Sequence, residues 1–117
     1  MPQLITVETK LIRINPVENR LEISFTNGST WMYRSRPGKL VGRFKDLLWF
    51  HNKLFALTDT GLWRSVNEGA VWAKCGSGKI VESLVAIQDG GQYLYGLSSE
   101  GRLWRSYNEG ADWSLKG

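Results

Sequence analysis

Three aromatic residues are each followed directly by an arginine, and these pairs are the clearest candidates for binding chemistry. They are Tyr33-Arg34, Trp63-Arg64 and Trp104-Arg105. Aromatic faces stack on sugar rings or nucleobases, and a guanidinium offers two parallel donors to a carboxylate or phosphate. The functional interpretation is a repeated ligand-binding site for a glycan or an anion. In the structural alternative, the tryptophans pack between sheets and each arginine pairs with an acidic turn residue such as Glu68 or Glu109.

Residue types that support catalysis or metal binding stand alone in this sequence. His51 falls in a predicted turn, without Cys, His or acidic residues at metal-ligand spacing, so we expect no metal site. Cys75 is the single cysteine, and a buried or half-buried thiol is expected rather than a nucleophile. Residues 76–79 lack the upstream glycine and the following helix of a phosphate-binding loop. We therefore predict a protein that is not an enzyme and that uses no cofactor.

The tryptophan-arginine pairs lie in a segment that the chain repeats after 41 residues. Residues 62–72 are LWRSVNEGAVW, and residues 103–113 are LWRSYNEGADW. A repeat of this length is typical of β-propellers and related architectures. We expect a degenerate third copy in which Tyr33-Arg34-Ser35 matches Trp63-Arg64-Ser65 and Trp104-Arg105-Ser106, followed by a turn at 36–38 and a last strand at 39–44.

Short strands joined by tight turns account for the whole chain. Residues 2–15 alternate as one strand that ends at Pro16, and Asn27-Gly28 predicts a hairpin turn between strands at 19–26 and 30–35. In the two later copies the predicted strands lie near residues 47–50, 53–58, 62–65, 71–73, 84–87, 92–97, 102–106 and 112–114. The only helix-like window, 81–87, is short and lies where the repeat predicts a strand.

The predicted fold class is all-β, with about three four-stranded antiparallel repeats that resemble propeller blades. The second strand of each later copy is apolar on both faces, with Leu54 and Ala56 opposite Phe55 and Leu57 in the second copy. Such a strand is covered on both sides, as in stacked sheets. We expect a single domain, 1–117, with repeats at about 1–42, 43–78 and 79–117.

Residues 65–72 and 106–113 resemble the Asp-box, or BNR repeat, of sialidase-like β-propeller proteins, whose pattern is Ser-x-Asp-x-Gly-x-Thr-Trp. The matching residues are Ser65, Asn67, Gly69, Trp72, Ser106, Asn108, Gly110 and Trp113. Asn replaces the Asp in both copies, and Val71 or Asp112 replaces the Thr. The resemblance implies a structural turn that lies away from any catalytic centre. Sialidase chemistry draws an arginine triad and other groups from several of six blades, so we expect no hydrolase activity here.

The turn chemistry gives each of these box residues a structural role. We expect the serine hydroxyl and the Asn side chain to bond the turn backbone, Gly to take a positive φ, and Trp to pack across the hairpin. No box is expected in the first copy.

Composition limits the remaining possibilities. The chain has 117 residues, a net charge of +4 and no run of basic residues, so we expect no nucleic-acid partner. The single cysteine, the absence of an export signal as written and the absence of a long apolar run predict a cytoplasmic protein without a membrane span.

Two function classes remain open. Three blades do not close a ring, so we predict a homo-oligomer, most simply a dimer with six blades, in which residues 2–9 complete a neighbouring sheet. The first function is a non-enzymatic binding module that is lectin-like. The alternative is a small intracellular protein-binding adaptor or inhibitor, of the kind that phages or mobile elements encode, which occludes a larger partner.

Overall fold

Three four-stranded antiparallel sheets make up the protein, as a computed structural model that describes residues 4–35 and 41–117 shows. The first sheet holds β1 (Leu4–Val7), β2 (Lys10–Ile14), β3 (Leu21–Ser24) and β4 (Met32–Ser35). The second sheet holds β5 (Phe44–Phe50), β6 (Lys53–Thr58), β7 (Gly61–Ser65) and β8 (Ala73–Gly76). The third sheet holds β9 (Leu84–Asp89), β10 (Leu94–Ser98), β11 (Leu103–Ser106) and β12 (Ser114–Leu115), preceded by the helix α1 (Lys79–Ser83).

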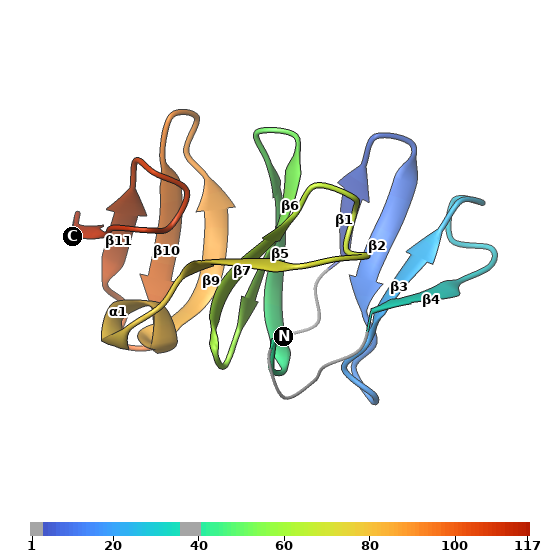
Figure 1. Cartoon of the computed structure of the whole chain (residues 1–117), viewed down its shortest axis with the longest axis horizontal. Helices are drawn as coiled ribbons and strands as arrows, with labels where there is room; N and C mark the ends of the chain where they lie inside the picture. Colours follow the sequence, from blue (N-terminus) through green and yellow to red (C-terminus); the bar gives the residue numbers. More distant parts are fainter. Residues whose placement is uncertain (1–3, 36–40) are drawn as a thin grey trace.

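The sheets stand side by side, with the third at the left and the first at the right of Figure 1. In each sheet the strands pair in sequence order, and the first strands β1, β5 and β9 lie next to one another. This arrangement confirms the predicted all-β class with three blade-like units. Completion of a ring by oligomerisation stays a prediction.

The N-terminal segment differs from its prediction. Residues 4–14 form a hairpin instead of one strand, because Glu8 takes a φ of 58° in a turn that lets Val7 pair with Lys10. β1 is therefore the first strand of its own sheet, and the expectation that residues 2–9 complete a neighbouring sheet is wrong for the described residues. Phe44 begins β5 of the second sheet and does not end the first copy, while residues 36–40 lie outside the described part.

A short helix occupies part of the window where a strand was expected. α1 follows Gly78, which has a φ of 101°, and Val81 is buried on its inner side. The Ser83 hydroxyl donates to the Ile80 carbonyl at 2.6 Å, and the chain turns extended at Leu84. The expectation that no helix follows the glycines at 76 and 78 is therefore wrong, since α1 begins at Lys79, although the upstream glycine of a phosphate loop is missing.

The register of the first copy also differs from its prediction. Ser24, Ser65 and Ser106 stand 41 residues apart and end β3, β7 and β11, the third strand of each sheet. Tyr33 and Arg34 lie in β4, the fourth strand, so they do not match Trp63-Arg64 and Trp104-Arg105. The similarity of the three short segments was misleading because the period places Glu22 at the position of Trp63.

Each of the three serines anchors the turn that follows it; we call residues 24–31, 65–72 and 106–113 the serine turns. The Ser65 hydroxyl accepts the Asn67 and Gly69 amides, and Asn67 accepts the Val71 amide. The third turn makes the same bonds from Ser106 and Asn108.

The first serine turn contradicts the expectation that the first copy has no box, because it makes the same kind of hydrogen bonds as the later two. Ser24 accepts the Thr26 and Gly28 amides, and the Thr26 hydroxyl accepts the Thr30 amide. Asn27 and Gly28 have φ values of 56° and 92°, as the hairpin prediction required. Thr26 therefore takes the place of the Asn in the later turns.

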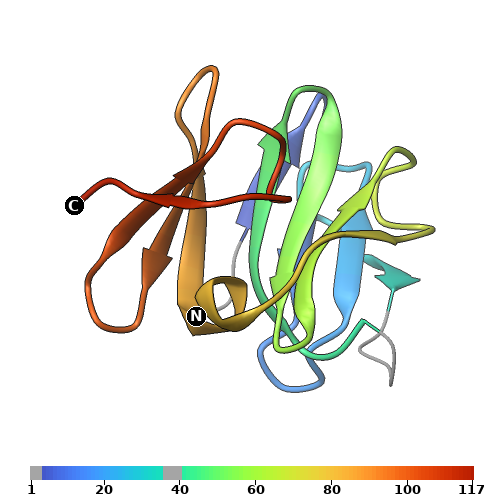
Figure 2. The same ribbon diagram turned by 60° about the vertical axis from the view of Figure 1, so that its left-hand side comes forward.

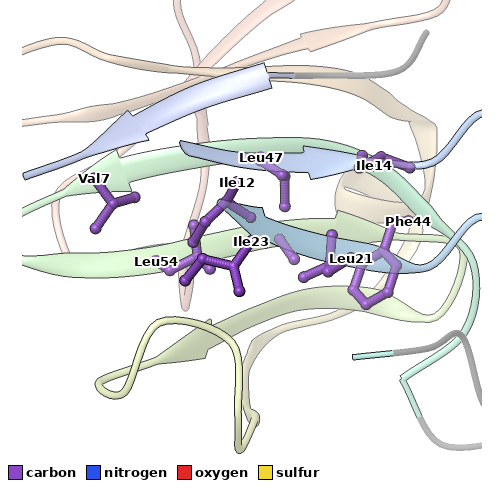
Figure 3. Packing of buried hydrophobic residues seen from close by; sticks show 9 residues of the cluster. Val7, Ile12, Ile14, Leu21, Ile23, Phe44, Leu47 and Leu54 are labelled. Atoms are coloured by element: carbon purple, nitrogen blue, oxygen red, sulfur yellow. The ribbon is translucent and has the colours of Figure 1, made fainter. Parts of the chain in front are cut away.

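Two apolar cores lie between the three sheets. The core between the first and second sheets holds Val7, Ile12, Ile14, Leu21, Ile23, Phe44, Leu47, Leu54 and Ala56 (Figure 3). The core between the second and third sheets holds Phe50, Phe55, Leu57, Leu62, Val81, Leu84, Ile87 and Leu94. Leu54 and Ala56 thus face one core and Phe55 and Leu57 the other, which confirms the expectation for this strand.

The hydrogen bonds that the Ser24 hydroxyl accepts in the first serine turn are expected to stabilise the fold. Ser24→Ala removes the acceptor for two backbone amides and lowers the free energy of unfolding by about 2 kcal/mol. Ser29→Ala, at an exposed position of the same turn, is the matched control and changes it little. Urea unfolding measures both variants, and equal stabilities would contradict the assigned turn.

Candidate functional site

Acidic residues of the serine turns join each sheet to the one before it. Glu68, in the second turn, accepts a hydrogen bond from Lys10 of the first sheet. Glu109, in the third turn, accepts from Lys53 at 2.8 Å and from Arg64 at 3.1 Å, both in the second sheet. Lys10 and Lys53 hold the same position, at the start of the second strand of their sheets.

The backbone conformation shows why these glutamates matter. Glu68 and Glu109 have φ values of 61° and 59°, a region in which Asn and Gly are far better tolerated than Glu. The same position of the first turn, which has no sheet before it in the described chain, is Asn27. The local cost of the glutamates is thus offset by contacts between sheets.

The tryptophan-arginine pairs divide between core and junction. Trp63 is 4% exposed and donates to Thr60, while Arg64 pairs with Glu109, as in the structural alternative. Trp104 packs against the core between the second and third sheets. Binding of a ligand by these pairs stays a prediction. Arg64 already donates one hydrogen bond, from Nη1, to Glu109 of the neighbouring sheet.

Arg34 contributes to the other junction. Its guanidinium donates to the backbone carbonyls of Glu68 at 3.0 Å and Asn67 at 2.7 Å. Its neighbour Tyr33 is 53% exposed on β4. The structure thus does not bring the three aromatic-arginine pairs together into one site.

The outward face of the third sheet combines exposed apolar side chains with an arginine. Here Arg105 lies 5.1 Å from the ring centroid of Tyr93 and 5.2 Å from that of Tyr107. The two tyrosine rings meet edge to face at 4.5 Å, and Tyr95 pairs with Arg105 across the strands. We call Tyr93, Tyr95, Arg105 and Tyr107 the tyrosine-arginine cluster.

The polar atoms of this cluster are only partly paired. Arg105 Nε is buried without a hydrogen-bond partner among the described residues. The pKa of Tyr107 is raised, first by its hydrogen bond with Tyr93 and then by desolvation. Within the cluster Tyr107 is 60% exposed. Beside it Leu97 is 42% exposed and, with Tyr95 and Leu103, lines a hollow of about 90 Å³. The face therefore offers aromatic and aliphatic area with a guanidinium that has unused capacity.

The outward face of the first sheet has the opposite character. Glu22 binds Arg13 at 2.9 Å and Arg20 at 2.8 Å, and its side chain is 5% exposed. Burial alone would raise the pKa of Glu22, but the hydrogen bonds from Arg13, Arg20 and Asn15 outweigh it and the pKa is lowered. Arg13 also covers Trp31, with its guanidinium 3.9 Å from the ring centroid. The charged groups of this face are thus paired with one another, and its tryptophan is covered by one of them.

A cleft of about 460 Å³ opens where the first and second sheets meet, but its polar groups serve the fold. Asp59 accepts the Arg43 amide, and Lys45 donates to the Glu82 and Leu84 carbonyls. Asn19 closes its wall through two hydrogen bonds with the Phe44 backbone.

Two single reactive residues are also structural. Burial raises the pKa of the Cys75 thiol to about 11, so it is neutral at pH 7. His51 stacks on Phe50 at 3.7 Å and its Nδ1 lies 3.6 Å from Glu109. Among residues 4–35 and 41–117, no group of three His, Cys, Asp or Glu side chains could hold a metal ion. In the same ranges, no helix is long and apolar enough to cross a membrane.

Sequence reasoning missed the tyrosine-arginine cluster and the two junction lysines. The usable signal was the period itself, because Arg64 and Arg105 stand 41 residues apart and Phe55 and Tyr95 pair with them across the strands. Arg105 therefore occupies the position of Arg64, and its partner Tyr95 that of Phe55, which the third sheet covers.

No protein-family model matches the chain, and no curated protein sequence matches it. Solved structures do share its fold, and three of them follow. YCF48 bound to D1 peptide matches with a TM-score of 0.70 and 14% identity over 97% of this chain and 44% of that chain. YCF48 from Cyanidioschyzon merolae matches with a TM-score of 0.67 and 14% identity over 97% and 35% of the two chains.

The third structure is PorZ, an essential bacterial surface component of the type-IX secretion system of Porphyromonas gingivalis. It matches with a TM-score of 0.69 and 13% identity over 97% of this chain and 15% of that chain. This chain thus spans less than half the length of each of the three structures. They are β-propeller proteins, so the three sheets have the arrangement of propeller blades.

The junction at Glu109 predicts a loss of stability in acid. Its hydrogen bond with Lys53 is the main cause of a pKa below the ordinary 4.5, so folding favours the carboxylate. The stabilisation is complete above the ordinary pKa and is lost as the pH falls through the lowered value. Glu109→Gln should cost about 1 kcal/mol at pH 7 and flatten the dependence of stability on pH below 4.5.

Glu100→Gln, an exposed change in the same sheet, is the control. Urea unfolding at a series of pH values measures the effect. A Glu109→Gln protein with the acid sensitivity of the original chain would remove the assigned role of this carboxylate.

Proposed function

We propose that this chain is a non-enzymatic β-propeller module that binds a protein partner through the outward face of the third sheet. The observation that carries the proposal is the contrast between the two outward faces. The first sheet is closed by the Glu22 network, whereas the third sheet exposes Leu97 and Tyr107 around an arginine with an unpaired buried nitrogen.

The composition of this face fits a protein-binding surface. Tyrosine and arginine are enriched at protein interfaces, where rigid aromatic area is combined with a directional polar group. An exposed apolar patch on a small domain commonly marks an interaction site. YCF48, one of the structures with the same fold, was solved bound to a peptide, which supports a protein ligand as the class.

The lectin-like function predicted from the sequence has weaker support. It depended on three equivalent aromatic-arginine pairs, and Tyr33-Arg34 is not equivalent to the other two. The intracellular adaptor or inhibitor predicted as the alternative agrees with the proposed protein partner. Its source and its cytoplasmic location stay predictions.

The homo-oligomeric ring is a separate prediction with a physical difficulty. A head-to-tail dimer places the third sheet of one chain on the first sheet of the other. Arg13, Glu22 and Arg20 would then lie within an interface, where desolvation of charges is costly. We therefore favour a different protein as the partner.

Selection from a phage-displayed peptide library against the immobilised chain tests the proposed function. The selected peptides should bind at least about tenfold more weakly to Leu97→Asp, because a carboxylate in the contact face loses its hydration, and tenfold corresponds to about 1.4 kcal/mol. Val17→Asp, at a position that is 87% exposed on the first sheet, should bind like the original chain.

Two results would contradict the proposal. One is that the selected peptides bind Leu97→Asp as tightly as the original chain. The other is that a glycan array gives specific binding that Arg64→Ala and Arg105→Ala weaken, which would restore the lectin-like function.

A further inference from the structure

The third sheet repeats, position by position, the surface with which the second sheet holds its neighbour. In the second sheet Phe55 pairs with Arg64 and Leu57 with Leu62, and in the third sheet Tyr95 pairs with Arg105 and Leu97 with Leu103. Phe55, Leu57 and Leu62 are fully buried by the third sheet. The side chains at the matching positions of the third sheet have no sheet against them in the described chain (Figure 2).

The polar part of the two surfaces also matches, with one element missing. Arg64 donates to Glu109, an acid at the tip of the serine turn of the next sheet. At the first junction the contact with Glu68 comes instead from Lys10, which holds the position of Lys53, the other cation that binds Glu109. Arg105 is the counterpart of Arg64, and its Nε is buried without an acceptor among the described residues, with the guanidinium against the rings of Tyr93 and Tyr107. The missing element is therefore a carboxylate that arrives on a turn.

We propose that the outward face of the third sheet is a docking site for a partner protein's β-sheet, whose turn presents a carboxylate to Arg105 beside Tyr93 and Tyr107. The inference rests on the proposed function and names the chemistry of the partner. Leu97, Leu103 and Tyr95 cover the apolar face of the docked sheet, and Arg105 selects the acidic turn.

A second copy of this chain is a poor occupant. At the turn position that would meet Arg105 it offers Asn27, which is neutral, instead of Glu. At the positions of the core residues Ala56 and Trp63 its first sheet carries Arg13 and Glu22, which are already bound to each other. Polar outer faces of this kind are typical of the terminal repeat of a stack.

The chain itself supplies a partner sheet for the test. Gly76 and Gly117 stand 41 residues apart, so a second copy of residues 77–117 joined after Gly117 continues the repeat in phase. The appended copy brings a serine turn whose Glu corresponds to Glu109. Coverage is measured as the rate at which iodoacetamide labels the thiol introduced by Leu97→Cys in the original sheet, followed by mass spectrometry. Cys75 is an internal reference, since its pKa of about 11 keeps its labelling slow.

The extension should slow labelling at position 97 at least about tenfold, because the thiol then reacts only after local opening of the docked sheet. Gln in place of the appended Glu, or Arg105→Gln in the original sheet, should each restore part of the labelling rate. The two changes together should restore no more than one alone, since either removes the same contact.

Three outcomes would overturn the inference. Unchanged labelling after extension means that the face does not accept a sheet. Equal protection by the Glu and Gln forms means that Arg105 does not select a carboxylate. Labelling of the unextended chain that slows with protein concentration identifies a second copy as the occupant.

The extension experiment uses no peptide or natural partner, so its failure is separate from failure of the peptide selection. If selected peptides bind through Leu97 while the extension gives no protection, the protein-binding function stands and only the sheet partner is wrong.

Discussion

An acid that reaches from the turn of one sheet to a cation on the sheet before it is the contact on which the stacking of this protein depends. The apolar cores bring the sheets together, and the ion pairs add a directional contact at each junction. Glu68 forms an ion pair with Lys10, and Glu109 forms ion pairs with Lys53 and Arg64. These contacts hold the same position of each turn against the start of the second strand of the preceding sheet, with Arg64 adding a contact from the third strand. The repeat of 41 residues is thus also a repeat of junctions.

This junction gives the stack a direction. Every sheet receives the next one through its outward apolar face and one or two cations, and the third sheet keeps that face with Tyr95, Leu97 and Arg105. The outward face of the first sheet presents no comparable unpaired group, because Arg13 and Arg20 both form ion pairs with Glu22. Function is therefore expected at the end of the stack where the pattern continues.

Much of the architecture could be predicted from local residue patterns. β6 was predicted to be covered on both faces because Leu54, Phe55, Ala56 and Leu57 are all apolar, and the two cores confirm it. The later serine turns were recognisable from Ser, Asn, Gly and Trp at fixed spacing. These features depend on residues that lie close together in the chain.

Features that depend on distant residues were missed or assigned wrongly. The first serine turn escaped notice because Thr26 makes the hydrogen bond that Asn67 makes in the second turn. Glu8 has no strong turn propensity, so the break between β1 and β2 was not expected. The junction ion pairs join residues that are 45 to 58 positions apart, for which the sequence has no local signal.

The central claim is that the turn acid and the cation of the preceding sheet stabilise the stack as a pair. A double-mutant cycle with Lys53→Met and Glu109→Gln, followed by urea unfolding at low salt, measures it most directly. The account predicts a coupling free energy of about 1 kcal/mol, within the range found for residues in direct contact. Additive effects of the two substitutions would contradict it, because the sheets would then be held by their apolar cores alone.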